Sequence, residues 1–212
     1  MDIATMRKEY ALAGLDRPEL DPDPLKQFTK WFAIHLAAPD GEPNIMTLAT
    51  AGRDGAPTSR SLLLKGYDAD GFRFFTNYGS RKARQIEENP RVSLTFHWYE
   101  LERQVNIEGS VTRTSREVSR AYFNSRPLGS RFGAILSAQS SVVADRAYLE
   151  ARLRELEERY ATEDPPLPEH WGGYCVRPTR YEFWQGRLNR LHDRFQYRLE
   201  TTGAWVIERL AP

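Results

Sequence analysis

The stretch FFTNYGSRKARQIEENPRVSL, residues 74–94, decides the architecture predicted for this chain, because it joins two strand-like segments through a short helical one. Aromatic and β-branched residues at 72–77 and at 91–99 are typical of strands. Ser80 can cap the start of a helix between them, and Pro90 ends that helix. The stretch therefore predicts a mixed architecture in which helices interrupt a run of strands.

Further strand-like segments lie on both sides of this stretch. We expect strands at 45–51, 58–67, 103–113, 173–177, 180–186, 190–199 and 204–210. We expect helices at 2–13, 25–38, 115–125 and 144–161. Two strand meanders separated by helices indicate an α+β fold. So many strand edges would aggregate if they stayed open, so we expect a small barrel or closed sheet.

The domain organisation predicted from length is simple, because 212 residues suffice for one domain with a substantial core. We expect a single domain over residues 1–212. Within it, residues 1–43 form an N-terminal arm and helix. Residues 163–212, which open with a proline-rich linker, form a C-terminal strand segment that completes the domain.

The composition is that of an ordinary globular protein, with 40% hydrophobic and 28% charged residues. A net charge of +1 gives no overall field to attract nucleic acid or a membrane surface, so we expect neither as a partner. The N-terminus lacks the apolar core of a secretory signal, and the lone Cys175 excludes a disulfide within the chain. We therefore expect a cytoplasmic protein.

The sequence motifs of several enzyme classes are absent. The chain has no glycine-rich dinucleotide fingerprint, no P-loop, no HExxH motif and no nucleophile elbow. Its four histidines are scattered without metal-ligand spacing, so we expect no metal site. This pattern favours an enzyme that takes its reactivity from an organic cofactor.

Two cationic clusters lie near the strand–helix junction. Arg81 and Lys82 stand in the first turn of the predicted helix, where they oppose the helix dipole unless an anion such as phosphate binds there. The alternative is a solvated helix end. Arg60 and Lys65 lie five residues apart on a predicted strand and face opposite sides of it unless a bulge or the strand end intervenes. The alternative for this pair is an edge strand with charged ends.

A third cluster, RLHDR, places Arg190, His192 and Arg194 on one face of a predicted strand. Like charges stacked in this way repel each other unless an anion or an acid lies opposite. They also bias His192 toward its neutral form. The alternative is an exposed strand face that is paired with acids across the sheet.

A fourth tract surrounds predicted loops and offers phenol, guanidinium, hydroxyl and amide groups. Its polar members are Tyr122, Asn124, Ser125, Arg126, Ser130, Gln139, Ser140 and Ser141. Taken alone, this tract indicates no more than a polar loop.

Together with RKEY at 7–10 and ERLAP at 208–212, eight blocks in a fixed order span nearly the whole chain. They are RSLLLK (60–65), FFTNYGSRKARQIEENPRVSL (74–94), LERQVNIEG (101–109), YFNSRP (122–127), AQSS (138–141), LPEHWGGYCVRP (167–178), EFWQG (182–186) and RLHDRF (190–195). In these blocks the chain resembles the pyridoxine/pyridoxamine 5′-phosphate oxidase family.

The resemblance implies an antiparallel split β-barrel that binds FMN, flanked by helices. It also implies a homodimer with flavin at the subunit interface, to which the C-terminal segment contributes. The implied activity is oxidation of pyridoxine or pyridoxamine 5′-phosphate by O2 to pyridoxal 5′-phosphate, with release of H2O2, and of ammonia from the amine. Such an enzyme serves the synthesis and salvage of vitamin B6.

The resemblance also implies roles for individual residues. FMN contacts match Arg60, Ser61, Leu62, Leu63, Leu64, Lys65, Phe75, Thr76, Arg81, Lys82, Gln104, Gln139, Ser140, Trp184 and Arg194. Substrate contacts match Arg7, Tyr10, Lys65, Tyr122, Arg126, Ser130, Arg190 and His192. Of these, Arg190 and His192 are the expected catalytic residues, which hold the pyridine over the flavin. Phe75 stands where some relatives have Tyr, so a backbone contact would survive there and a hydroxyl contact would not.

Two rival functions remain open at this point. One keeps the fold and FMN but changes the substrate, as in a flavin oxidase of the phenazine-pathway type. The other is a non-catalytic carrier of FMN or pyridoxal phosphate, which turnover with oxygen would exclude.

Overall fold

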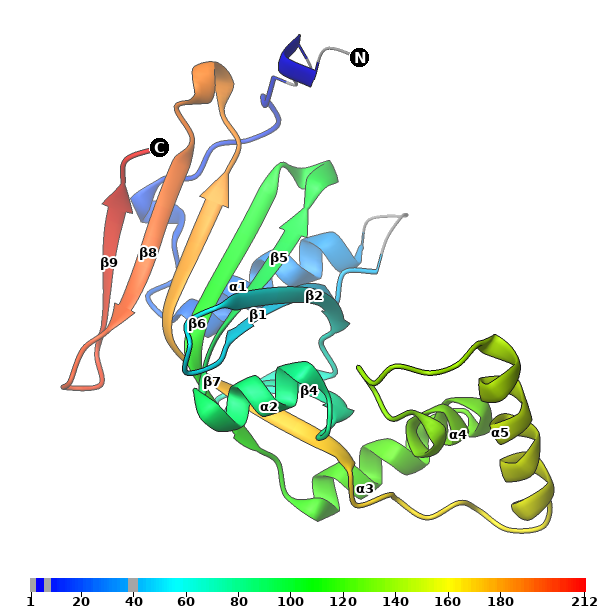
Figure 1. The fold of residues 1–212 in the computed structure, drawn as a ribbon. Coiled ribbons are helices and arrows are strands. Elements are labelled where there is room, and N and C mark those ends of the chain that lie inside the picture. Colours follow the sequence, from blue (N-terminus) through cyan, green and yellow to red (C-terminus); the bar gives the residue numbers. More distant parts are fainter. Residues whose placement is uncertain (1–2, 6–8, 38–41) are drawn as a thin grey trace.

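The computed structural model describes residues 3–5, 9–37 and 42–212. It contains one curled antiparallel sheet, with three of the helices gathered at one end (Figure 1). The strands are β1 (Ile45–Ala51), β2 (Pro57–Leu63), β3 (Gly66–Asp68), β4 (Gly71–Asn77), β5 (Arg91–Trp98), β6 (Arg103–Arg113), β7 (Trp171–Gln185), β8 (Asp193–Leu199) and β9 (Trp205–Leu210). The helices are α1 (Pro24–Leu36), α2 (Arg81–Glu88), α3 (Arg116–Ser125), α4 (Leu128–Leu136) and α5 (Arg146–Arg159).

The long strand β7 organises the sheet, whose strand order is β2-β1-β5-β6-β7-β4-β3. β7 pairs with β6 along nearly its whole length. On its other edge, β7 pairs with β4 over its first part and with β8 over its second part. The sheet therefore divides along β7 into two lobes, with β8 and β9 forming a separate wing. The β6–β7 register shifts at Gly109, where a Cβ atom would lie 2.2 Å from the carbonyl oxygen of Arg177. Only glycine fits such an approach.

The chain changes partner strands between β2 and β3. The Leu64 N–H donates to the carbonyl of Asn44, and the Lys65 N–H donates to the carbonyl of Arg73, both at 2.8 Å. The predicted strand at 58–67 is therefore wrong as a single element, because the backbone leaves one edge of the sheet and joins another at this point. Lys65 lies at this break, so the alternation of a regular strand does not fix its direction relative to Arg60.

An aromatic core lies between α1 and the sheet. Phe28 of α1 is fully buried, and its ring centroid lies 5.0 Å from those of Phe72 and Phe96. The helix begins where Asp23 accepts the N–H of Leu25 at 2.9 Å, as the predicted cap requires. Burial of these rings fixes α1 against the inner face of the sheet.

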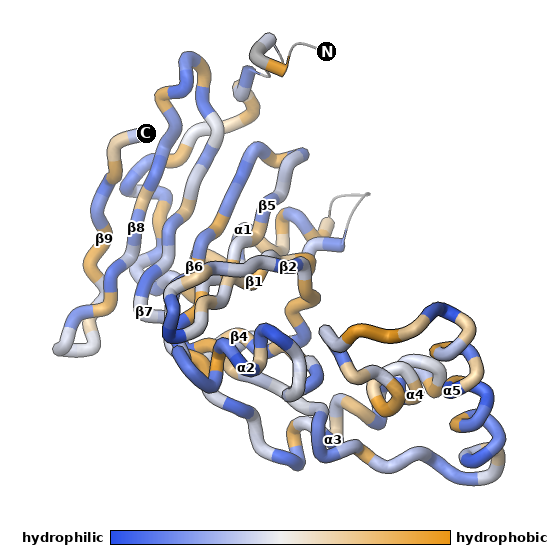
Figure 2. Tube along the Cα trace, in the orientation of Figure 1, coloured by the Kyte–Doolittle hydropathy of each residue, from blue (hydrophilic) through white to orange (hydrophobic). Residues whose placement is uncertain are grey.

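The α+β prediction is confirmed, as are the helices near 25–38, 115–125 and 144–161. α5 is hydrophilic along most of its length, and Leu156 is its single buried residue (Figure 2). None of the described helices has the length and apolarity needed to cross a bilayer. The helix α4 was not predicted, because glycines interrupt its apolar pattern.

Two predicted elements at the chain ends are wrong in part. Of the helix predicted at 2–13, the described residues form only the 3-10 turn Ile3–Thr5, and 9–13 are not helical. The backbone N–H of Leu12 is bound instead to a carboxylate oxygen of Glu102 at 3.1 Å. The strand predicted from residue 190 begins only at Asp193. The segments 173–177 and 180–186 belong to the one strand β7.

Candidate functional site

A buried lysine lies in the first turn of α2. Lys82 is 6% exposed, and its Nζ lies 2.7 Å from Oε1 of Gln139, 3.1 Å from Oγ1 of Thr76 and 3.3 Å from Oγ of Ser80. All three partners are neutral oxygens. Burial is the larger cause and the positive charge of Arg60 the smaller one, and together they lower the pKa of Lys82 to about 8.

Two arginines bring their charges to the same place. Arg60 of β2 donates from Nη1 to Oγ1 of Thr50 at 2.7 Å, and both burial and the charge of Arg81 lower the pKa of its guanidinium. The backbone N–H of Arg81 donates to Oγ of Ser140 at 3.3 Å. Within the described ranges, no carboxylate forms an ion pair with Arg60, Arg81 or Lys82. We call these three residues the α2 cation cluster. It has the composition of a phosphate site.

A cavity of about 570 Å³ opens beside the cluster, between β2, β4, α3 and α4. It is lined by Ser61, Leu62, Leu63, Lys65, Phe75, Thr76, Asn77, Tyr122, Arg126, Pro127, Ser130, Gly133, Ala134, Ser137, Gln139 and Trp171. Of the residues that the sequence predicted for a site, the lining contains Ser61, Leu62, Leu63, Lys65, Phe75, Thr76, Tyr122, Arg126, Ser130 and Gln139. Leu64 is an exception, since its side chain is buried in the core rather than facing the cavity.

A second cationic position lies across this cavity. The Nη1 atom of Arg126 is buried and forms no hydrogen bond with any described residue. The guanidinium carbon lies 5.0 Å from the ring centroid of Trp171, and burial lowers the pKa of Arg126. A buried donor without a partner is expensive, so the geometry favours an anionic ligand at this point.

Three parallel rings form one wall of the cavity. The ring centroid of Phe75 lies 4.0 Å from that of Tyr122 at an interplanar angle of 21°, and 5.6 Å from that of Trp171 at 15°. The Gly173 backbone leaves room for Phe75, because a Cβ atom there would lie 2.7 Å from the ring. The wall fixes the Tyr122 ring beside Arg126. Trp171 contacts both Tyr122 and Arg126, although the sequence predicted no role for it.

The remaining predicted residues form a second group on another part of the sheet. Gln104, Trp184 and Arg194 are directly paired across β6, β7 and β8, so their side chains project from one face. The ring centroids of Trp184 and His192 lie 4.7 Å apart. The ring of Tyr10 completes the cluster, at 5.7 Å from Trp184 and 5.9 Å from His192.

The imidazole of His192 is held by the loop that carries it. Its Nδ1 accepts the backbone N–H of Arg187 at 3.1 Å, which leaves Nε2 as the ring nitrogen available to a ligand. Burial lowers the pKa of His192, and the charge of Arg190 lowers it further. His192 is therefore biased toward the neutral form, as expected from the sequence.

The predicted common face of Arg190, His192 and Arg194 is wrong, because Arg190 lies in a 3-10 turn before β8. Its φ of 61° and the φ of 56° at Asn189 are left-handed, so the strand alternation does not apply to it. Arg194 does lie on the strand, and its Nε is 2.8 Å from Oε1 of Glu182. An acid across the sheet thus offsets this cation, as the alternative interpretation required.

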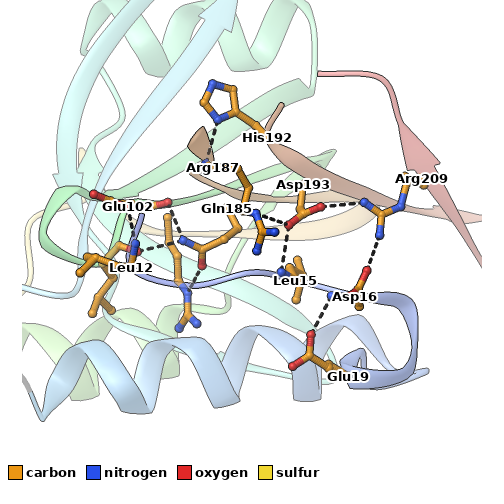
Figure 3. Close-up of polar contacts among 12 residues, drawn as sticks. Leu12, Leu15, Asp16, Glu19, Glu102, Gln185, Arg187, His192, Asp193 and Arg209 are labelled. Atoms are coloured by element: carbon orange, nitrogen blue, oxygen red, sulfur yellow. Dashed lines mark hydrogen bonds and ion pairs between the residues drawn. The ribbon is translucent and has the colours of Figure 1, made fainter. Parts of the chain in front are cut away.

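A polar network ties the N-terminal segment to this loop (Figure 3). The carboxylate of Asp193 accepts the backbone N–H of Leu15 at 3.1 Å and Nη1 of Arg209 at 2.7 Å. The carboxylate of Glu102 accepts the N–H of Leu12 in the same way. These contacts hold the segment that carries Tyr10 against the loop that carries His192. Arg7, also predicted to contact substrate, lies outside the described residues.

The two groups of predicted residues are separated within one chain. The connection between β7 and β8 lies at the opposite end of the molecule from α3 and α4 (Figure 1). None of the second group lines the cavity described above. The described residues also contain no cluster of three His, Cys, Asp or Glu side chains that could hold a metal ion.

Comparison with known proteins identifies the chain. A model described as pyridoxamine 5′-phosphate oxidase matches residues 35–160, and a second, described as the pyridoxine 5′-phosphate oxidase C-terminal dimerisation region, matches residues 171–212. The chain belongs to the pyridoxine/pyridoxamine 5′-phosphate oxidase family. Proteins of that name from Crocosphaera subtropica and Rubrobacter xylanophilus are 54% and 56% identical to it. The matches cover 100% of this chain and 100% and 97% of those proteins.

Solved structures of oxidase-like proteins share the fold. PhzG from Burkholderia lata 383, in complex with tetrahydrophenazine-1-carboxylic acid, matches 95% of this chain and 100% of its own with a TM-score of 0.89 at 27% identity. A pyridoxamine 5′-phosphate oxidase-related, FMN binding protein from Nostoc punctiforme matches 91% of this chain and 100% of its own with a TM-score of 0.72 at 17% identity. The predicted split-barrel fold is confirmed.

The residues present fit the cofactor that the family resemblance implies. The α2 cation cluster provides three cations without a carboxylate, which suits the phosphate of FMN. The buried, unpartnered Nη1 of Arg126 suits a second phosphate on the other side of the cavity. The aromatic wall of the cavity offers apolar ring surface to a planar ligand.

Proposed function

We propose that the protein is an FMN-dependent oxidase that converts pyridoxine and pyridoxamine 5′-phosphate to pyridoxal 5′-phosphate with O2 as acceptor. The observation that carries this proposal is a pair of anion positions at one cavity. Arg126 and Lys65 line it, and the α2 cation cluster lies beside it, where Lys82 contacts the lining residues Thr76 and Gln139. A phosphorylated cofactor and a phosphorylated substrate need two such positions. The names of relatives more than half identical in sequence point to the same phosphorylated substrates.

FMN, when bound, supplies the redox chemistry, and the protein supplies binding and orientation. In this proposal Lys82, Arg81 and Arg60 hold the cofactor phosphate, and Gln139, Ser140 and Thr76 orient the lysine and the start of α2. The backbone from residue 61 to 65 and Phe75 then border the flavin.

The substrate phosphate is assigned to four side chains on the other side of the cavity. Arg126 and Lys65 bring charge, and Tyr122 and Ser130 bring hydroxyl groups. Arg126 can bind two phosphate oxygens at once because its guanidinium presents a planar fork. Fixing the substrate phosphate at these four side chains positions the rest of the substrate for reaction at the flavin.

The second group of residues completes the site from another subunit in this proposal. Arg190 and His192 would hold the pyridine ring, and Gln104, Trp184 and Arg194 would contact the flavin. Because they lie away from the cavity of their own chain, a homodimer that pairs one chain's cavity with the other chain's loop accounts for both groups. The match of residues 171–212 to a dimerisation region supports this arrangement.

We also propose that residues 1–212 act as one domain, in which 163–212 completes both the barrel and the dimer interface. β7 supports this, because it pairs with strands from both parts of the chain. Tyr10 and Arg7 are assigned to a segment that covers the substrate, and the contacts of Tyr10 with His192 and Trp184 support this for Tyr10.

A second candidate substrate class follows from the similarity to PhzG, whose structure holds a tricyclic carboxylic acid. Such a ligand carries a carboxylate in place of a phosphate, and Arg126 could bind either anion, so turnover has to distinguish the two substrate classes. The test is turnover in air with purified, FMN-loaded protein, measured as pyridoxal 5′-phosphate formed and O2 consumed. We expect both with pyridoxine or pyridoxamine 5′-phosphate. Protein that binds FMN and forms no pyridoxal 5′-phosphate would contradict the proposal and support a carrier or another substrate.

A further inference from the structure

Gln85 of α2 lies behind the α2 cation cluster and has no assigned role. It is 8% exposed. Its Oε1 accepts hydrogen bonds from Oγ1 of Thr50 at 2.7 Å and from Oγ1 of Thr58 at 2.6 Å. Its Nε2 donates to the carbonyl of Ala56 at 3.4 Å, which fixes which end of the amide faces the two hydroxyls.

The same two hydroxyls receive the guanidinium of Arg60. Nη1 of Arg60 donates to Thr50 at 2.7 Å, and Nη2 donates to Thr58. A guanidinium can only donate, so each hydroxyl oxygen acts as an acceptor toward Arg60 and must send its single proton elsewhere. The Oε1 atom of Gln85 takes both protons. The hydrogen bonds therefore run in one direction, from Arg60 through the two threonines to Gln85.

This network opposes the repulsion within the cluster. The positive charge of Arg81 lowers the pKa of Arg60, and the charge of Arg60 in turn lowers the pKa of Lys82, so the three cations repel one another. A long, flexible arginine side chain in that field would turn away toward solvent if nothing held it. The two threonines and the carbonyl oxygen of Leu48 hold it, and the acceptor behind the threonines turns their hydroxyl protons away from the guanidinium.

The amide is also the right neutral group for this place. A carboxylate here would accept the same two protons, but it would add a negative charge next to Arg60. That charge would offset part of the attraction that the cluster offers to an anion. A glutamine fixes the hydroxyls and leaves all three positive charges available.

We propose that Gln85 is a positioning residue that orients Arg60, through Thr50 and Thr58, toward the phosphate of FMN. The inference rests on the proposed function in one respect, namely that the FMN phosphate occupies the α2 cation cluster. It predicts that Gln85 contributes to recognition of the phosphate and not of the isoalloxazine ring.

The test compares two ligands that differ only in the phosphate. FMN-free protein is titrated with FMN and with riboflavin, and each dissociation constant is read from quenching of flavin fluorescence. The parental protein should bind FMN more tightly than riboflavin. Gln85→Met, which keeps the side-chain length and removes the acceptor, should raise the dissociation constant for FMN about tenfold and leave that for riboflavin unchanged.

Three further variants separate the proposed role from a structural one. Gln85→Glu should also weaken FMN selectively, because it keeps the acceptor and adds a negative charge. Thr58→Val on β2 should act in the same direction by a smaller factor, and it tests the network even if the buried Gln85 variants fold poorly. Ser59→Ala, the neighbouring exposed position whose side chain alternates to the other face of β2, should change neither constant.

Three outcomes would overturn the inference. If Gln85→Met and Thr58→Val bound FMN as the parental protein does, Gln85 would have no positioning role, and the proposed function would stand. If they lost FMN and riboflavin equally, the network would be structural. A parental protein that binds FMN no better than riboflavin would instead refute the phosphate site itself, and with it both the proposed function and this inference.

Discussion

Nζ of Lys82 lies 2.7 Å from Oε1 of Gln139, so a buried ammonium group is held by an amide oxygen and not by a carboxylate. The two residues come from α2 and from the loop after α4, and Gln139 lines the cavity beside the α2 cation cluster. A carboxylate at this place would neutralise the positive charge of Lys82 whether or not a ligand is bound. The amide satisfies its hydrogen bonds and leaves its charge free to attract an anion.

The lowered pKa of Lys82 predicts how FMN binding depends on pH. In the cofactor-free protein Lys82 is charged below about pH 8 and neutral above it, although an ordinary lysine keeps its proton up to about 10.5. Since phosphate binds the charged form, affinity for FMN should fall as the pH rises through 8. Binding above pH 8 should take up a proton, and calorimetry in buffers of different ionisation enthalpy measures this uptake.

The matched control is Lys82→Met, which should bind FMN at least about tenfold more weakly and lose the proton uptake. Proton uptake that persisted unchanged in Lys82→Met would assign the titration to another group.

Local signals explain why the start of α2 was predictable. Ser80 caps the helix by accepting the N–H of Ala83, as its place before Arg81 and Lys82 indicates. The burial of Lys82 was not predictable, because it depends on Gln139, which is 57 residues away in the sequence. Likewise, nothing next to Gln85 in the sequence indicates that two threonines from other strands converge on it.

The errors near the C-terminal cluster have an equally local cause. Alternation in RLHDRF predicts a strand from Arg190, but left-handed backbone at Asn189 and Arg190 delays it to Asp193. Asparagine tolerates that conformation and was the one available signal. In α4, Gly129 and Gly133 weaken the helical pattern. The sequence therefore predicts a polar loop where the structure has a helix that lines the cavity.

Arg126→Ala should weaken binding of the phosphorylated substrate and leave flavin content unchanged. The reason is that its buried Nη1 has no hydrogen-bond partner among the described residues, and that Arg126 lines the cavity whereas Lys82 does not. Loss of a charged phosphate contact corresponds to roughly tenfold or more in KM. The control is Arg120→Ala, at an exposed position of α3, which should change neither KM nor flavin content. Loss of FMN with unchanged KM in Arg126→Ala would reverse the assignment of the two phosphate positions.

Arg190→Ala and His192→Ala should each stay folded, dimeric and yellow, because both residues lie at a loop and not in the core. Reduction of their bound flavin by pyridoxine 5′-phosphate without oxygen should slow by about an order of magnitude, the size of a positioning effect. Reoxidation by O2 should keep the parental rate. Stopped-flow absorbance separates the two steps. Reduction at the parental rate in both variants would make RLHDR a structural feature.

Mixing two impaired variants tests whether the site is shared between subunits. A heterodimer of an Arg126→Ala chain and a His192→Ala chain would contain one intact site and one site with both changes. Co-expressed chains that pair at random should therefore recover roughly a quarter of the parental activity. Homodimers of either variant assayed separately are the controls. No recovery in purified heterodimers would place Arg126 and His192 of the same chain in one site.

The most direct measurement is the absorbance of the FMN-loaded protein when substrate is added without oxygen. We expect pyridoxine 5′-phosphate and pyridoxamine 5′-phosphate to bleach the flavin band, and air to restore it with formation of pyridoxal 5′-phosphate. Pyridoxine without its phosphate should bleach the band far more slowly at the same concentration, because it cannot engage Arg126 and Lys65. A flavin band that neither phosphorylated compound bleaches would contradict the assignment of this protein as an oxidase of these substrates.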